Sequence, residues 1–211
     1  MTKQAISRRG LLKTSLLGAA AGIAGTGVAT TAVAAPKKAD ASYDVIVLGA
    51  GPAGLITAIT AHDLGAKVAL FEKMDRPAGN AIFALGSVCG WGTRHQAEQG
   101  IKDTAEDFYK MMMDISKQMG DKVLNRVYTD NISAGIDWLE SDIGVKFGKI
   151  RVMPYPRLGR TCRVEGNGLT GGARLVHKLL EAAQKRGIDV CFHPKANELL
   201  HDNQVAVTGV R

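Results

Sequence analysis

A run of apolar residues that leads directly into a glycine-rich turn constrains the fold of this chain more than any other feature. Residues 43–54 read Tyr-Asp-Val-Ile-Val-Leu-Gly-Ala-Gly-Pro-Ala-Gly. The unbroken apolar run 45–48 is typical of a parallel strand that is covered on both faces. Residues 54–64 continue with helical spacing and no proline, and Gly65 supplies a helix stop. Because residues 67–71 then read as a second strand, the pattern predicts a β-α-β unit.

The three glycines of the turn have separate predicted roles. Gly49 allows a sharp turn off the strand, Gly51 lets the backbone approach a pyrophosphate, and Gly54 lets the helix pack closely on the sheet. The free N–H groups and the dipole of the helix N-terminus favour that negative charge. Glu72, eighteen positions after Gly54, could accept hydrogen bonds from ribose hydroxyls. The segment predicts a dinucleotide site; the weaker alternative is a β-α-β unit with a tight turn and no ligand.

The first 34 residues have the composition of an export signal. Residues 7–13, Ser-Arg-Arg-Gly-Leu-Leu-Lys, precede 22 uncharged residues that are mostly small, and residues 32–34 fit a small-x-small cleavage site. Twin arginines before a weakly apolar segment are typical of the twin-arginine route, which exports folded proteins. We predict a signal peptide over 1–34, a linker over 35–42, and an exported, periplasmic protein. A retained membrane anchor is less favoured because leucines are few, and a disordered tail is less favoured still.

This segment accounts for much of the basicity of the chain. The sequence has 27 basic and 20 acidic residues, a net charge of +7. Four of the basic residues and no acidic residue lie in 1–34, so 23 basic residues remain against 20 acidic ones, a net charge of +3. That modest charge does not indicate nucleic-acid binding. Cys89, Cys162 and Cys191 form no C-x-x-C pair, so neither haem attachment nor a metal site is indicated.

The chain after Glu72 departs from a simple nicotinamide-binding fold. Four glycines interrupt regular structure there: Gly79, Gly86, Gly90 and Gly92. The apolar residues between them predict a stretch packed against the protein, with an exposed loop as the alternative. Two helices are predicted next, over 103–119 and 122–142, the first starting at a sequence that resembles a capping box, 103–106. Its methionines are expected in the core, and a short strand is predicted over 145–147.

Residues 149–172 form a second irregular region. It contains four arginines: Arg151, Arg157, Arg160 and Arg163. Its glycine run, 166–172, opens a helix predicted over 173–186. A glycine-rich helix start suits a phosphate, but a flexible connector with solvated arginines is an equally good interpretation. A strand over 188–193 and a hairpin over 198–211, with its turn at Asp202-Asn203, follow.

Together these elements predict an α/β fold. We expect a Rossmann-like domain with a parallel sheet, a helical segment and an antiparallel β-hairpin. A hairpin after a β-α-β half leaves the parallel sheet and the dinucleotide site unfinished. The fold is therefore expected to be incomplete at the C-terminus.

Several motifs resemble the flavoprotein family of fumarate reductases and succinate dehydrogenases, in particular its soluble, exported bacterial branch. The motifs are residues 47–55, 71–80, 100–103, 137–140 and 207–210. The resemblance covers 43–211 and implies that this stretch is the N-terminal part of a FAD-binding domain. The family's substrate-capping domain, its proton-donating arginine and its substrate-binding histidines lie further toward the C-terminus. We therefore name no catalytic residue.

The resemblance also implies which residues bind FAD. The glycine turn would hold the pyrophosphate, Glu72 the adenosine ribose with Lys73 beside it, and Ala196 the adenine through its backbone. Residues 79–81 would line the path toward the flavin ring. The full implied set is Gly49, Ala50, Gly51, Pro52, Ala53, Gly54, Glu72, Lys73, Gly79, Asn80, Ala81 and Ala196.

Three details of the cofactor pocket differ from patterns found in the family. Membrane-bound members attach FAD through a histidine in the segment that matches 79–86, whereas this chain has Asn80 and no histidine there, which implies non-covalent FAD. Residues 78–80 read Ala-Gly-Asn where the family usually has Gly-Gly-Asn. Residues 160–163 read Arg-Thr-Cys-Arg where it often has Arg-x-His-Arg.

The implied activity is that of a FAD-dependent oxidoreductase that moves a hydride between flavin and an activated carbon–carbon bond, as in fumarate reduction. Its partners would be an unsaturated carboxylate or related enone and the twin-arginine export machinery. An external electron donor is also implied, because no C-x-x-C-H haem module is present. Two alternatives are a NAD-dependent Rossmann dehydrogenase, which Glu72 permits, and a non-catalytic FAD-binding remnant.

Overall fold

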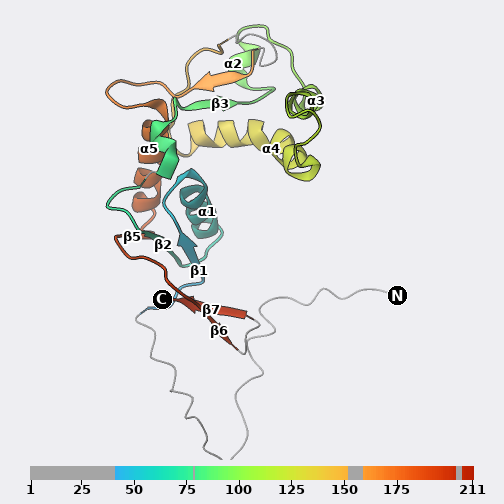
Figure 1. Cartoon of the computed structure of the whole chain (residues 1–211). Coiled ribbons are helices and arrows are strands. Elements are labelled where there is room, and N and C mark those ends of the chain that lie inside the picture. The colour runs from blue at the N-terminus through green and yellow to red at the C-terminus, as the bar shows by residue number, and fades with distance from the viewer. Residues whose placement is uncertain (1–40, 78, 152–158, 203–205) are drawn as a thin grey trace, which may run out of the picture. The chain divides into compact units, whose positions relative to one another are not determined.

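The computed structural model describes residues 41–77, 79–151, 159–202 and 206–211 (Figure 1). The predicted signal peptide, most of the predicted linker, Ala78, Arg157 and the Asn203 position of the predicted hairpin turn lie outside the described residues. Within the described ranges, no helix combines the length and the apolar character that a membrane span requires.

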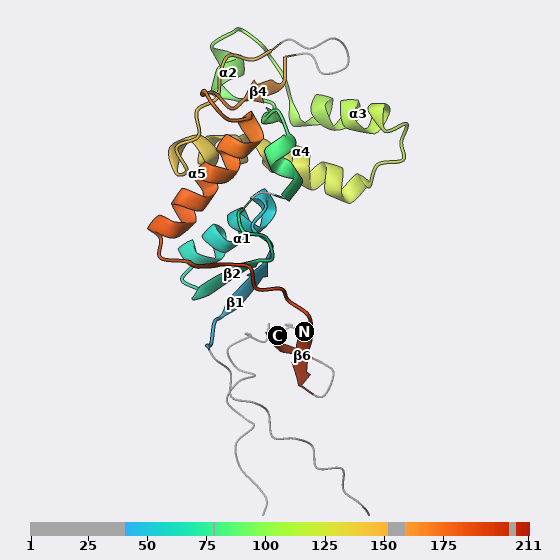
Figure 2. The same ribbon diagram turned by 60° about the vertical axis from the view of Figure 1, so that its left-hand side comes forward.

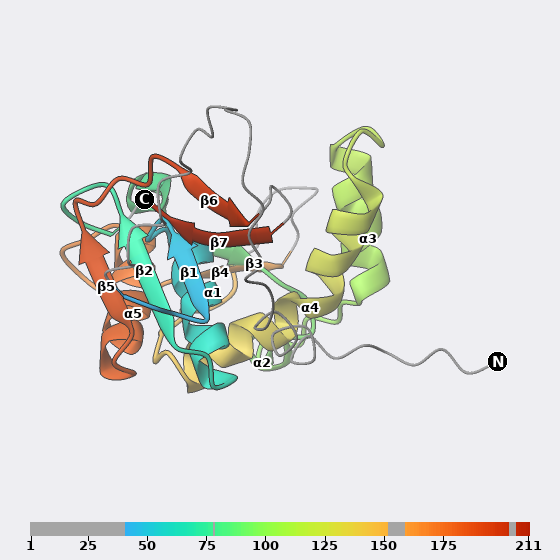
Figure 3. The ribbon, with the colours of Figure 1, turned by 90° about the horizontal axis from the view of Figure 1, so that it is seen from below.

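A three-stranded parallel sheet confirms the predicted β-α-β unit and the α/β fold. Its strands are β1 (Val45–Leu48), β2 (Val68–Glu72) and β5 (Asp189–Phe192), in the order β1-β2-β5 (Figure 3). Helix α1 (Pro52–Asp63) connects the first two strands, and α5 (Gly171–Lys185) leads into the third. Gly65 has a φ of +89°, as a glycine just beyond a helix end often has.

Two helices, α3 (Ala105–Ile115) and α4 (Lys122–Ser141), agree with the predicted pair, although the first is shorter than expected. Thr104 caps α3, because its Oγ1 accepts a hydrogen bond of 3.1 Å from the Asp107 N–H. Asp103, the first residue of the expected capping sequence, forms an ion pair with Arg160 instead. The strand predicted over 145–147 is reduced to one β-bridge between Phe147 and Val164.

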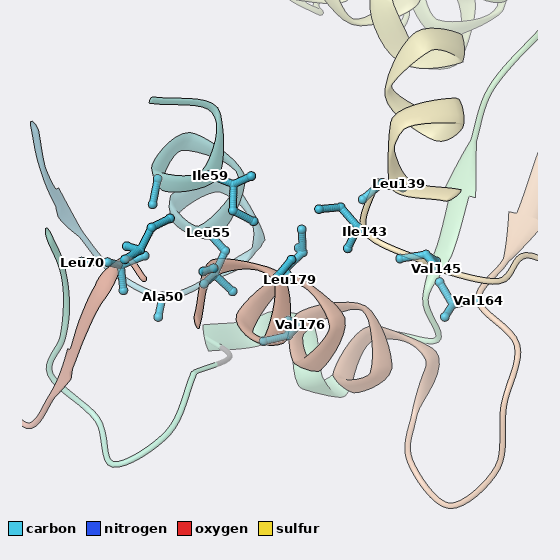
Figure 4. Packing of buried hydrophobic residues seen from close by; sticks show 14 of the residues in the cluster. Ala50, Leu55, Ile59, Leu70, Leu139, Ile143, Val145, Val164, Val176 and Leu179 are labelled. Carbon is cyan, nitrogen blue, oxygen red and sulfur yellow. The ribbon is translucent and has the colours of Figure 1, made fainter. Parts of the chain in front are cut away.

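The core lies where α1, α5 and the C-terminal end of α4 meet beside the sheet. Figure 4 shows Val176 and Leu179 of α5 in the middle of this cluster, with Leu55 of α1 on one side and Leu139 of α4 on the other. Each of these four side chains is at most 7% exposed. Burial of such side chains contributes about 1.5–3 kcal/mol each. This cluster therefore stabilises the packing of α1, α4 and α5 against one another.

Strand β1 is less covered than its apolar run predicts. Val47 is buried, but Ile46 and Leu48 on the opposite face are 37% and 48% exposed. The strand lies at the edge of the sheet. Strands β6 (Leu199–Asp202) and β7 (Ala206–Val210) pair antiparallel and confirm the predicted hairpin. The hairpin and the exposed face of β1 together line a small cavity. An apolar run therefore predicts a strand without showing what covers it.

The irregular stretch after β2 contains two short elements. The 3-10 helix η1 (Gly79–Phe83) is followed by β3 (Ser87–Cys89), which pairs antiparallel with β4 (Thr161–Arg163). The expected packing is correct for Val88, which contacts the core, and wrong for Phe83 and Leu85, which are 78% and 62% exposed. A short helix, α2 (Arg94–Ala97), begins at a capping box that sequence reasoning missed.

Candidate cofactor-binding site

The turn between β1 and α1 has the backbone geometry that its glycines predict. Gly49 has a φ of +107°, which residues with a side chain rarely adopt. A Cβ on Gly54 would lie 1.9 Å from the Gly49 carbonyl oxygen, so glycine is required for this close approach of helix and turn. A Cβ on Gly51 would meet no atom within 4 Å, so this residue borders open space. Contact of Gly51 with a pyrophosphate stays a prediction.

The N-terminus of α1 has backbone donors to spare. Gly51 at the N-cap offers no side-chain acceptor, and no acidic residue lies in the first turn. The first hydrogen bond of the helix runs from the Leu55 N–H to the Gly51 carbonyl, at 3.0 Å. Among the described residues, the N–H groups of Ala53 and Gly54 have no acceptor. Such a helix start attracts an anion, because its unpaired N–H groups and the helix dipole act together.

Glu72 holds the turn from the neighbouring strand. Its side chain is only 7% exposed, and its carboxylate accepts hydrogen bonds from the Ala50 N–H at 2.8 Å and the Met74 N–H at 2.9 Å. Sequence reasoning predicted a ribose contact for Glu72 and missed this structural role. Each carboxylate oxygen has two acceptor positions, so the capacity to accept from ribose hydroxyls remains.

Other predicted residues lie in the segments that follow β2 and β5. Lys73 is exposed and follows Glu72 directly. The segment after β5 returns past this point, because the His193 N–H donates to the Met74 carbonyl at 3.2 Å, and Ala196 is exposed three residues further along. Asn80, within η1, is also exposed. Their contacts with adenine and flavin stay predictions.

The second glycine-rich helix start, at α5, is filled by the protein itself. The Thr170 Oγ1 accepts a hydrogen bond of 3.2 Å from the Ala173 N–H, and the Gly172 N–H donates to the Ala84 carbonyl at 3.0 Å. A Cβ on Gly172 would lie 1.9 Å from the Ala81 carbonyl oxygen. The glycines thus allow α5 to pack against residues 81–86 (Figure 2). Two of the backbone donors that a phosphate would use at this helix start are therefore taken by the protein.

The arginines of the second irregular region have different surroundings. Arg160 is 9% exposed, pairs with Asp103 and lies over the Phe108 ring, with its guanidinium carbon 5.2 Å from the ring centroid. Arg151 and Arg163 border a cavity of about 830 Å³. Sequence reasoning missed this cavity, since no sequence signal shows that β3 pairs with β4.

The fold and the turn define a dinucleotide-binding α/β domain of the Rossmann type. The FAD binding domain family matches residues 44–211. The chain therefore belongs to the FAD-dependent flavoprotein family that includes the fumarate reductases and succinate dehydrogenases, as its motifs predict, and its cofactor is FAD.

Individual relatives agree with this assignment. The chain is 37% identical over 178 residues to the NADH:fumarate oxidoreductase of Klebsiella pneumoniae and 30% identical over 184 residues to the urocanate reductase of Eggerthella lenta. Both alignments cover 84% of this chain, but 18% and 29% of the relatives. The open conformation of a flavocytochrome c3 fumarate reductase superposes with a TM-score of 0.74 at 29% identity, over 80% of this chain and 29% of the other. The chain thus spans less than a third of these relatives.

Proposed function

We propose that residues 43–211 hold FAD non-covalently at the β1–α1 turn, as the N-terminal part of the FAD-binding domain of an oxidoreductase. The observation that carries this proposal is the start of α1. It combines N–H groups without acceptors, open space at Gly51 and a buried Glu72 at the end of the adjacent strand. These are the donors and the acceptor that a pyrophosphate and its ribose need.

The proposal assigns residues of this chain to each part of the cofactor. The pyrophosphate would lie against the turn from Gly49 to Gly54, the adenosine ribose against Glu72 and Lys73, and the adenine against the backbone of Ala196. Gly79, Asn80 and Ala81 of η1 would line the path toward the flavin, and an asparagine at position 80 in place of histidine favours non-covalent binding. FAD, when bound, supplies the hydride-transfer chemistry, whereas the protein binds and orients it.

The whole protein would reduce an activated carbon–carbon double bond. The fumarate and urocanate reductases among the relatives are named for unsaturated carboxylates, so we infer that class of substrate, with a related enone as the wider class. An external donor would supply the electrons. The match to a FAD-binding family favours FAD over a nicotinamide as the cofactor at the turn.

Replacement of Gly51 by valine tests the placement of FAD. A valine side chain would occupy the open space beside the α1 N-terminus, so Gly51→Val should purify without visible flavin absorbance and with an unchanged circular dichroism spectrum. Gly135→Val is a matched control, because a Cβ on Gly135 of α4 also meets no atom within 4 Å; it should keep its flavin. If Gly51→Val retained flavin like the control, the proposed location would be wrong.

Export through the twin-arginine route completes the proposal. The observations are the paired Arg8 and Arg9, the weakly apolar segment and the small residues at 32–34. We propose a signal peptide over 1–34, a linker over 35–42 and a periplasmic location for the mature protein. The variant Arg8→Lys, Arg9→Lys should leave the protein in the cytoplasm, as measured by fractionation of expressing cells. Normal export of this variant would contradict the proposal.

A further inference from the structure

The largest cavity described above lies between the β3–β4 pair and the helices α3 and α4. Its volume of about 830 Å³ falls within the roughly 300–1,000 Å³ typical of small-molecule sites. Residues 84–86, which follow η1 directly, form part of its wall. The cavity therefore begins where the proposed path toward the flavin ends.

The polar wall of the cavity is one face of the β3–β4 pair. In the register of the strands, Ser87 lies opposite Arg163 and Cys89 opposite Thr161. A β-bridge adds Arg151 next to Thr161, with a hydrogen bond of 3.1 Å from the Arg151 N–H to the Thr161 carbonyl. Cross-strand neighbours project to the same face of a sheet, and all five of these residues line the cavity.

This polar wall is positively charged. Arg151 and Arg163 contribute two guanidinium groups, and no acidic side chain is among the described residues that line the cavity. In the part of the chain that the structure describes, neither guanidinium forms an ion pair; Arg163 Nε donates to the Leu85 carbonyl at 3.3 Å. A planar guanidinium with free donors binds a carboxylate well, because two parallel N–H groups match its two oxygens.

The opposite wall is apolar and comes mainly from α3. Phe108, Met111, Met112 and Ile115 line the cavity at helical spacing, so they form a single stripe along the helix. The expectation that the methionines lie in the core is correct for Met113, which is buried, whereas Met111 and Met112 are only partly buried. Methionine side chains adapt to the shape of an apolar ligand. Tyr128 of α4 closes the wall, with its hydroxyl donating to the Cys89 carbonyl at 2.8 Å.

We propose that this cavity binds the substrate, and that the substrate is an unsaturated carboxylate with a bulky apolar, preferentially aromatic, substituent. Arg163 and Arg151 would bind the carboxylate, and the α3 stripe would cover the apolar body. A small dicarboxylate such as fumarate would leave the α3 stripe uncovered. The identification of the ligand as the substrate rests on the proposed function, because the latter places the path toward the flavin along residues 79–81, shortly before residues 84–86.

Three probes separate the two recognition elements. trans-Cinnamate has the carboxylate and the apolar body, cinnamamide has the body without the charge, and fumarate has the charge without the body. In calorimetric titrations of the full chain, cinnamate should bind about tenfold more tightly than either of the others, since a charge-assisted hydrogen bond or a buried ring contributes at least that much. Equal affinity for cinnamate and fumarate, or no binding of cinnamate, would overturn the proposal.

Variants and methyl resonances locate the binding. Arg163→Gln should reduce cinnamate affinity about tenfold, to the level of cinnamamide, whereas Lys178→Gln, on an exposed part of α5, should not change it. In spectra of methyl-labelled methionine, Met111 and Met112 should shift on addition of cinnamate, and the exposed Met74 should not. Shifts confined to other methionines would place the ligand elsewhere and contradict the proposal.

Flavin content distinguishes failure of this inference from failure of the proposed function. A chain that retains flavin but does not bind cinnamate overturns the inference and leaves the FAD proposal intact. A chain that binds cinnamate through Arg163 but retains no flavin supports the carboxylate site and refutes both the FAD location and the description of the ligand as a substrate.

Discussion

Two helices of this domain begin with glycine-rich segments, and they use glycine for different purposes. At α1, Gly51 leaves the cap without a side-chain acceptor and borders open space. At α5, Thr170 supplies the cap, and Gly171 and Gly172 are pressed against the backbone of residues 81–86. In the sequence both starts suit an anion. The comparison shows that the cap residue and the packing around a helix N-terminus together decide whether its donors are available to a ligand.

The largest expected effects come from adding a methyl group at the two tight packing points. Gly54→Ala and Gly172→Ala each place a Cβ 1.9 Å from a carbonyl oxygen. Helix propensity alone would favour alanine by about 1 kcal/mol, but the clash should dominate and cost about 3 kcal/mol or more. Urea unfolding of the full chain measures this, with Gly135→Ala as a control that should be at least as stable as the parent. Unchanged stability of either variant would show that the close packing is not required.

Glu72→Gln should have the next largest effect. It should act on the turn before α1 and leave the start of α5 unchanged. The amide has one acceptor oxygen, so the N–H groups of Ala50 and Met74 cannot both keep their partner. We expect a loss of about 1–3 kcal/mol in the free energy of unfolding and weaker flavin retention. The exposed Glu181 of α5 is the control, because Glu181→Gln should change stability by less than about 1 kcal/mol. A stable, fully flavin-loaded Glu72→Gln protein would contradict both the support of the turn by Glu72 and its contact with the ribose.

Thr170→Ala removes the cap of α5 and tests whether the start of this helix takes part in flavin binding. Loss of the hydrogen bond to the Ala173 N–H should cost about 1 kcal/mol. Flavin retention at saturating FAD should not change, because the start of α5 is occupied by protein. Thermal unfolding and the visible spectrum of the same sample report the two results. If the flavin were lost while the fold persisted, the start of α5 would have to be regarded as a ligand site.

The smallest effect concerns Cys162 of β4. This strand pairs with β3, which follows the segment 81–86 that packs against the start of α5. Burial raises the pKa of the Cys162 thiol from 9.0 to about 11, so it should stay protonated and resist alkylation at pH 8 until the chain is unfolded. The unfolded thiol ionises first, so stability should fall as the pH rises from about 9 towards 11. Mass spectrometry of iodoacetamide-treated protein measures the reaction, with the partly exposed Cys89 as the internal comparison. Rapid alkylation of native Cys162 would mean that β4 opens readily.

Much of the fold follows from local patterns. The β1–α1–β2 unit, α5 with β5 and the β6–β7 hairpin were all predictable, because alternation, helical spacing and glycine stops act over a few residues. The pairing of β3 with β4 was not, since it joins segments more than 70 residues apart. The cavity lined by Arg151 and Arg163 was missed for the same reason. Arg160 and Asp103, which the sequence placed in unrelated regions, form a pair only after folding.

The amino-acid sequence alone determined the glycine turn, the acid at the end of β2 and the family, because each depends on residues that are neighbours along the chain. The tertiary structure decided which of the two glycine-rich helix starts remains open, and that Glu72 supports the turn it faces. It also decided that Met111 and Met112 of α3 line a cavity. These outcomes depend on contacts between distant segments, whose packing no local pattern encodes.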